Sequence, residues 1–404
     1  MREVRSVPPL LLMLALVFSP EEIRAHDPSA YGGLFRSRDD GATWLPANPG
    51  RIVSGAIALA VSPVDGNHLL LATDSGLLRS RNGGLDWTVE APSVLVGAVF
   101  AVVFDADGRR ALASTGSAIF RSEDDRSGQS WHRAATPPEA APARVLVAGA
   151  GGRAYLAGWR RVYRTEDGGA SWSDAAAGLP DEPVAALAVV PGPAEILYAV
   201  VAGRAWTSAD AGRTWQERGT GLPAGHVETV RPDVHQPARA WAVAAGQVFR
   251  SDDRGEPWQP VGRPLPDSGV AARAIAVAAG GSAITLSTDR GLYRSADGGE
   301  RWALVTDNLP GHLDTWPLVP DPTEPATLYA GFALVPYPEL WRLAAEGGAS
   351  LGRLAPATLA GSAALLALVG LAGAIALRWL ARRSGRPAPP VPPMESRQAG
   401  EPRH

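Results

Sequence analysis

The sequence predicts an all-β fold, a seven-bladed β-propeller, followed by one C-terminal transmembrane helix. Three observations support this prediction. A turn motif ending in Trp recurs seven times, each repeat holds four short strand-like segments, and a long uncharged stretch lies near the C terminus. Gly and Pro, with 45 and 36 copies among 404 residues, indicate a chain with many turns and few long helices.

The repeat is defined by an eight-residue motif, here called the octet, of which Ser37-Arg-Asp39-Asp-Gly41-Ala-Thr43-Trp44 is the first copy. Successive octet Trp residues stand 41 to 44 positions apart, and one copy has two extra residues in its turn. We expect the Asp or Asn side chain to accept turn N–H groups, Gly to supply a positive φ, and Trp to fill the space beneath the hairpin. The Asp or Asn and the Trp of the seven copies are Asp39 and Trp44, Asn82 and Trp87, Asp124 and Trp131, Asp167 and Trp172, Asp210 and Trp215, Asp253 and Trp258, and Asp297 and Trp302.

Each repeat reads as four strands. In the second repeat these are 56–61, which is apolar throughout, then 69–72, 77–79 and 87–89. A period of roughly 40 to 50 residues with four strands is typical of a propeller blade. We expect the first, apolar strand of each blade to be the innermost.

The two ends of the repeat region predict how the ring closes. Only one strand, 33–36, fits before Trp44, whereas 314–319, 327–330 and 340–343 are strand-like segments after the last octet. We therefore expect the C-terminal strands to complete the blade that the N-terminal strand begins, which gives seven blades.

An Arg directly precedes most octets. Two interpretations are open: a basic binding stripe, or side chains whose stems cover the neighbouring blade, and we favour the second. The residues are Arg36, Arg79, Arg121, Arg164, Arg250 and Arg294.

The chain divides into five predicted regions: a signal peptide at 1–25, the propeller at 26–345, a linker at 346–356, a transmembrane helix at 357–377, and an Arg- and Pro-rich cytoplasmic tail at 378–404. An uncleaved N-terminal anchor is the alternative to a cleaved signal. A buried apolar helix is the alternative to the transmembrane helix.

Charge predicts the topology of the chain. An Arg cluster follows 357–377, so by the positive-inside rule the C terminus is cytoplasmic and the propeller lies outside the cytoplasmic membrane as a single-pass protein. Residues 1–25 are neutral and 378–404 carry +4, so with −3 for the chain the segment between them carries −7. An acidic ectodomain argues against a nucleic-acid partner.

The residues that hold metals and cofactors are scarce. The chain has no Cys, and its seven His never take a metal-ligand spacing. No nucleophile-elbow or phosphate-binding motif occurs either. We expect no metal and no cofactor.

The octet resembles the Asp-box, or BNR, repeat. This superfamily includes sialidases, xyloglucan-cleaving glycoside hydrolases, the sortilin ectodomain and the photosystem II stability and assembly factor family. The resemblance covers about 31–345 and implies a propeller. In these families the Asp boxes lie away from the active site, so the resemblance predicts architecture more than chemistry.

The hydrolase members of the superfamily provide a test of enzymatic activity. Sialidases have an Arg-Ile-Pro motif near the start, and the nearest string here is Arg51-Ile52-Val53. They also pair a Tyr nucleophile with Glu, and no Tyr of this chain has a clear Glu partner in the sequence. A xyloglucanase-like carboxylate pair would come from loop acids. The candidates are Asp181, Glu182, Asp267, Asp307 and Asp314.

In ring size, periphery and predicted export the chain resembles the assembly-factor family, whose members are small extracytoplasmic propellers. This resemblance implies an Arg-rich surface patch, for which the turns between second and third strands offer Trp159, Arg160, Arg161, Arg204 and Arg290. The alternative is that these arginines only solvate the tips of their turns. The sequence thus favours a membrane-anchored, non-enzymatic binding or assembly platform for a protein or glycan partner. The alternative is an Asp-box glycoside hydrolase, sialidase-like or xyloglucanase-like.

Overall fold

The computed structural model describes residues 32–123, 130–192, 195–233, 236–310, 313–334 and 337–345. All of them belong to the first of two compact units, Met1–Gly348. The predicted signal peptide, linker, transmembrane helix and cytoplasmic tail lie outside these residues, as does Asp124 of the third octet. Across the described ranges, no helix is both long and apolar enough to span a bilayer.

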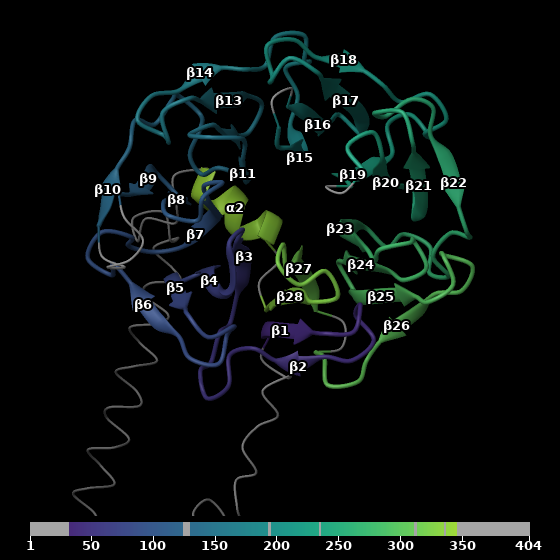
Figure 1. The fold of residues 1–404 in the computed structure, drawn as a ribbon, viewed down its shortest axis with the longest axis horizontal. Helices are drawn as coiled ribbons and strands as arrows, with labels where there is room; N and C mark the ends of the chain where they lie inside the picture. Colours follow the sequence, from purple (N-terminus) through teal and green to yellow (C-terminus); the bar gives the residue numbers. More distant parts are fainter. Residues whose placement is uncertain are drawn as a thin grey trace, which may run out of the picture. The chain divides into compact units, whose positions relative to one another are not determined.

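Seven four-stranded antiparallel sheets form a ring, which confirms the predicted seven-bladed propeller (Figure 1). Four blades run in simple chain order, and their strands are β3 (Ala56–Ser62), β4 (Asp65–Thr73), β5 (Gly76–Ser80), β6 (Thr88–Glu90); β7 (Val99–Phe104), β8 (Ala111–Thr115), β9 (Ile119–Ser122), β10 (Trp131–Arg133); β11 (Val145–Ala148), β12 (Ala154–Ala157), β13 (Val162–Thr165), β14 (Ser173–Asp174); and β15 (Val184–Val190), β16 (Ile196–Val201), β17 (Arg204–Ser208), β18 (Gln216–Glu217).

Two further blades follow the same order, and the last blade joins the two ends of the repeat region. Their strands are β19 (Val227–Pro232), β20 (Ala240–Ala244), β21 (Gln247–Ser251), β22 (Gln259–Val261); β23 (Ala272–Val277), β24 (Ile284–Thr288), β25 (Gly291–Ser295), β26 (Ala303–Val305); and β27 (Asp314–Pro320), β28 (Leu328–Ala333), β1 (Gly33–Ser37), β2 (Leu45–Pro46).

The core consists of apolar layers between neighbouring blades. Between the blades β3–β6 and β7–β10, for example, Leu70 and Leu77 of one sheet share a buried cluster with Val99 and Val102 of the next. Both faces of a middle strand are buried in this way. This explains why the first two strands of a blade read as continuous apolar runs rather than as alternating patterns.

The ring closes through a blade of mixed origin. Its strand order is β2-β1-β28-β27, so the N-terminal strand β1 pairs with the C-terminal strand β28 from Gly33↔Phe332 to Ser37↔Leu328. Phe35 of β1 and Phe332 of β28 pack edge to face with ring centroids 5.3 Å apart. The predicted closure is therefore confirmed.

The octets form the turns between third and fourth strands, and in five copies the Asp or Asn side chain accepts a turn N–H as predicted. In the Asp253 copy the donor position is Pro257, which has no N–H. In the first copy the Ser37 hydroxyl donates to Asp39 Oδ1 (2.7 Å) and accepts the N–H of Gly41 (2.9 Å). Asp39 Oδ1 also accepts the N–H of Thr43 (2.9 Å). Gly41 has φ 79°, a left-handed conformation that favours glycine, and Trp44 is buried beneath the turn.

The octet Trp residues also link adjacent blades. The indole N–H of Trp87 donates to the carbonyl of Ala47 (2.8 Å), and that of Trp215 donates to the carbonyl of Ala175 (2.8 Å). Each acceptor lies in the preceding blade. In the third copy the acceptor is a side chain instead, because Trp131 donates to Glu90 Oε1 (2.8 Å).

Three of the arginines that precede octets, Arg36, Arg164 and Arg294, donate to a backbone carbonyl of a neighbouring blade, as the favoured interpretation expected. The guanidinium of Arg36 donates to the carbonyl of Gly83 (2.7 Å), and that of Arg164 donates to the carbonyl of Ala211 (3.0 Å). Arg79 instead forms a buried bidentate pair with Glu90, at 2.8 and 2.9 Å. This pair lies within one blade, whereas the contacts of Arg36 and Arg164 join neighbouring blades.

One element differs from the prediction. Residues 340–343, expected to be a strand, belong to α2 (Tyr337–Ala345). β27 and β28 already complete the closing sheet with β1 and β2, so no inner strand is missing. The segment is rich in helix-favouring residues, and Glu339 in the first turn and Arg342 in the last complement the helix dipole.

Candidate binding site

The predicted patch residues lie on one face of the ring, here called the connection face. Because strands in a blade alternate in direction, the turns between second and third strands emerge on the same side as the connections to the next blade. The octets lie in the turns on the opposite side. β28 ends on the connection face, so α2 follows it there (Figure 1).

The apolar side of α2 packs against the ring. Leu340, Trp341 and Ala344 contact a cluster that contains Ile57 of β3 and Phe100 of β7. Trp341 is only 5% exposed. The helix is therefore fixed to the inner strands of two blades.

An aromatic cluster forms where α2 contacts the blade β11–β14. The rings of Trp159 and Trp341 stack with centroids 4.7 Å apart and an angle of 19°. The guanidinium carbon of Arg144 lies 5.8 Å from the Trp159 ring centroid and 5.5 Å from that of Trp341. The Trp341 indole N–H donates to the carbonyl of Pro142 (3.1 Å). We call Arg144, Trp159 and Trp341 the Trp159 cluster.

A cavity of about 620 Å³ lies beside this cluster. Trp159, 39% exposed, and Trp341 supply aromatic surface, and Arg160 and Arg161 come from the same turn as Trp159. The volume is within the range of about 300–1,000 Å³ that is usual for ligand sites. The structure thus brings three of the five predicted patch residues together.

The charges around the cavity have both signs. Arg160 Nη1 lies 3.9 Å from Asp181 Oδ2, and Arg161 Nη1 lies 3.3 Å from Asp174 Oδ2. Glu139 also lines the cavity. These ion pairs are exposed and contribute at most about 1 kcal/mol each, so a partner can exchange them for its own charges.

The other two predicted patch residues lie apart from this cavity. Arg204 begins β17 in the next blade, where its Nη1 lies 2.8 Å from Glu217 Oε1. Arg290 lies in the turn between β24 and β25. Neither lines the cavity, so the predicted residues form one group of three and two separate positions.

Sequence reasoning missed two members of the Trp159 cluster. The sequence analysis predicts a strand at Trp341, although its helix-favouring neighbours are a signal for α2. Arg144 directly precedes β11 and belongs to no motif, so only the ring geometry identifies it.

The predicted hydrolase acids are not gathered in one cleft. Only Asp181 lines the cavity, and its side chain is 70% exposed. Asp267 accepts the hydroxyl of Tyr293 at 2.5 Å, and burial together with this carboxylate raises the pKa of Tyr293 to about 12. Asp314 Oδ1 lies 3.4 Å from Arg273 Nε, inside the ring.

One Tyr does have a Glu partner, contrary to the sequence-based expectation. The Tyr155 hydroxyl donates to Glu195. Glu195 directly precedes β16, and only the folded ring brings it close to Tyr155 in β12. Burial and the Glu195 carboxylate raise the pKa of Tyr155. Tyr155 and Glu195 are 0% and 1% exposed, so this pair cannot reach a substrate and is structural.

Two further observations bear on catalysis. Asp181 and Glu139 are both exposed to water, so neither lies in an apolar site of the kind that surrounds a catalytic acid. Within the described part of the chain, no group of three or more His, Asp or Glu side chains could hold a metal ion.

Comparison with known proteins supports the fold. The solved structure "YCF48 bound to D1 peptide" matches with a TM-score of 0.54 and 18% identity, over 71% of this chain and 94% of that one. The structure of YCF48 from Cyanidioschyzon merolae matches with a TM-score of 0.52 and 16% identity, over 69% of this chain and 96% of that one. The GH74 xyloglucanase from Xanthomonas campestris gives 0.53 and 18%, over 72% of this chain and 53% of that one.

No protein-family model and no curated protein matches the sequence. At these identities the structural similarity establishes the propeller fold alone.

Proposed function

We propose that this protein is a membrane-anchored, extracytoplasmic propeller that serves as a non-enzymatic binding or assembly platform for a protein partner. The observation that carries the proposal is the Trp159 cluster beside its cavity of about 620 Å³. Trp and Arg are the residues most enriched at the energetic centres of protein interfaces. An ordered Trp pair flanked by charges of both signs is suited to an extended protein segment.

Two further observations support the proposal. The YCF48 structure is described as bound to a D1 peptide, so a propeller of this fold accommodates a peptide. The uncharged segment 357–377 with the Arg residues that follow it supports a single-pass anchor with a cytoplasmic C terminus. The Asp-box resemblance and the segment 1–25 favour export of the ring.

The test is partner recovery by the full-length chain in its native membranes. A photo-crosslinking residue at position 160 would capture the partner, which mass spectrometry identifies. We expect Trp159→Ala, and Arg160→Glu with Arg161→Glu, to reduce recovery at least tenfold. The matched control is Arg213→Glu, an exposed Arg in an octet on the opposite face. Unchanged recovery with the Trp159 and Arg160 variants would reject the connection face as the binding surface.

The hydrolase alternative is tested with the same purified chain. Fluorogenic sialosides and β-glucans should not be turned over, because the candidate acids are dispersed. Turnover that is abolished by Asp181→Asn, Asp267→Asn or Asp314→Asn would overturn the non-enzymatic assignment.

A further inference from the structure

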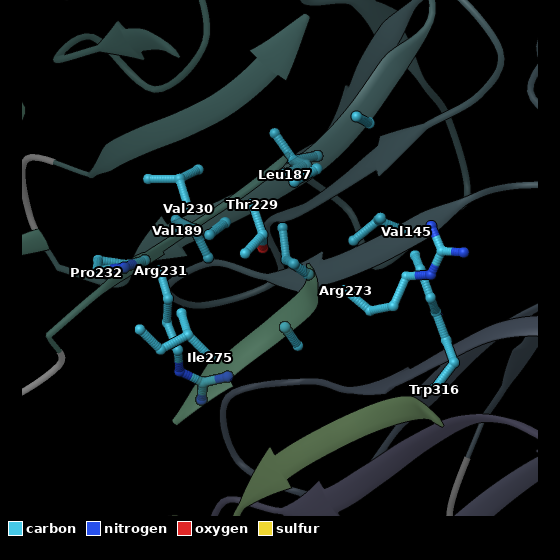
Figure 2. A pocket seen from close by; sticks show the side chains of 15 residues that line it. Val145, Leu187, Val189, Thr229, Val230, Arg231, Pro232, Arg273, Ile275 and Trp316 are labelled. Atoms are coloured by element: carbon cyan, nitrogen blue, oxygen red, sulfur yellow. The ribbon is translucent and has the colours of Figure 1, made fainter. Parts of the chain in front are cut away.

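The central channel contains a cavity separate from the Trp159 cluster. It measures about 290 Å³ and is lined by the inner strands β11, β15, β19, β23 and β27 (Figure 2). Most of the lining is aliphatic, with Val145, Val189 and Ile275 among it. Two arginines, Arg231 of β19 and Arg273 of β23, also line it. The volume is close to the lower limit of about 300 Å³ for small-molecule sites.

Arg273 has a counter-charge from the protein. Its Nε lies 3.4 Å from Asp314 Oδ1, and its guanidinium carbon lies 5.5 Å from the centroid of the Trp316 ring. A carboxylate and an aromatic face therefore compensate this cation.

Arg231 has no such counter-charge. Among the described residues, no carboxylate lies within 4.0 Å of its guanidinium, and no protein acceptor takes a hydrogen bond from it. Figure 2 shows its guanidinium beside Ile275 at the channel wall. Burial lowers the pKa of Arg231 to about 10, so the group remains charged at neutral pH at a cost in free energy.

An arginine in this setting selects a particular kind of ligand. The guanidinium offers two parallel N–H donors that match the two oxygens of a carboxylate. A phosphate would need donors around three or four oxygens, whereas the rest of this cavity is mostly aliphatic. A ligand with one singly charged oxyanion and an apolar remainder satisfies both parts of the site.

We propose that the central channel binds a carboxylate carried on a small apolar body, with Arg231 as the residue that holds the carboxylate. This site is distinct from the Trp159 cluster, and the proposal does not rest on the function proposed above. Loss of one site leaves the other in place.

The experiment measures binding to the full-length chain by calorimetry. The probes are N-acetylvaline, its uncharged amide N-acetylvalinamide, and inorganic phosphate. We expect N-acetylvaline to bind with one site per chain, and the other two to bind at least tenfold more weakly. Arg231→Met should weaken N-acetylvaline binding at least tenfold. The affinity of Arg231→Lys should lie between those of the natural chain and Arg231→Met, because Lys keeps the charge and loses the paired donors.

Two controls make the result decisive. Arg213→Met removes an exposed Arg of an octet and should leave N-acetylvaline binding unchanged. Arg231→Met should also raise the melting temperature without ligand, because it removes an uncompensated charge from the channel. Equal binding of acid and amide, tighter binding of phosphate, or unchanged binding by Arg231→Met would each overturn the proposal.

Discussion

In four octets, those of Asp39, Asp167, Asp210 and Asp297, a carboxylate orders the turn, and Asp167 shows how. Its Oδ1 accepts the backbone N–H of Ser171 (2.9 Å) and its Oδ2 accepts the hydroxyl of the same residue (2.6 Å). The Thr165 hydroxyl donates to Oδ1 (2.7 Å). The hydrogen bonds from Ser171, followed by that from Thr165, lower the pKa of Asp167 to about 2. The ionised form therefore stabilises the fold.

This pKa predicts how stability depends on pH. The folded pKa lies below the ordinary value of 3.8, so the contribution is present above about pH 4 and is lost as the pH falls towards 2. Asp167→Ala should lower the free energy of unfolding by about 1 kcal/mol at pH 6, since exposed hydrogen bonds contribute modestly. Asp167→Asn should cost less, because Asn82 occupies the same position in another octet and accepts the N–H of Asp86.

Urea titrations at pH 6 and pH 3 measure both effects. The difference in the free energy of unfolding between the natural chain and Asp167→Asn should be smaller at pH 3 than at pH 6. A difference that stays constant or grows as the pH falls would contradict the assigned role of the carboxylate.

At the scale of elements, α2 connects the ring to the candidate site. Trp341 contributes to both, since it packs on Ile57 and Phe100 and stacks on Trp159. The helix has no sheet to stabilise it, so its position depends on this one buried side chain more than on any other.

Trp341→Ala should therefore release α2. We expect the free energy of unfolding to fall by roughly 3 kcal/mol or more, which is typical of a buried aromatic replaced by Ala, and trypsin to cleave faster after Arg342. Trp159→Ala is the matched control. Because Trp159 is 39% exposed, its replacement should lower the free energy of unfolding by less. Thermal unfolding and the rate of limited proteolysis give the comparison. Equal effects of the two substitutions would show that α2 is held by other contacts.

At the scale of the whole molecule, closure joins the two ends of the repeat region. β1 and β2 lie near the N terminus, and they complete a sheet whose inner strands β27 and β28 come last. Arg294 Nε of β25 also donates to the carbonyl of Asp40 (2.9 Å). This hydrogen bond joins the blade β23–β26 to the closing blade. β1 thus pairs with the edge of β28 that would otherwise be exposed.

Removing β1 and β2 should open the ring. A chain that begins at Ala47 exposes the edge of β28, so we expect oligomers in size-exclusion chromatography and a less cooperative unfolding transition. A chain that lacks α2 instead should keep the elution volume of the natural chain and have a lower melting temperature. A monomer with unchanged cooperativity after removal of β1 and β2 would refute the closing role of these strands.

The sequence by itself determined the blades, their number and the closing arrangement. Octet spacing, apolar inner strands and the single N-terminal strand are local features, and local hydrogen bonds and burial enforce them. The prediction of a third C-terminal strand was wrong because an apolar segment of this length is compatible with helix or strand, and only the completed sheet excluded a strand.

The sequence predicted Trp159, Arg160 and Arg161, but only the tertiary structure added Arg144 and Trp341 to them and revealed the Arg231 site. Arg144, Trp159 and Trp341 come from three parts of the chain, and Arg231 lines a cavity formed by five of the seven inner strands. Such groupings depend on distances across the ring. Sequence separation carries no information about those distances until the sheet order and the direction of each strand are fixed.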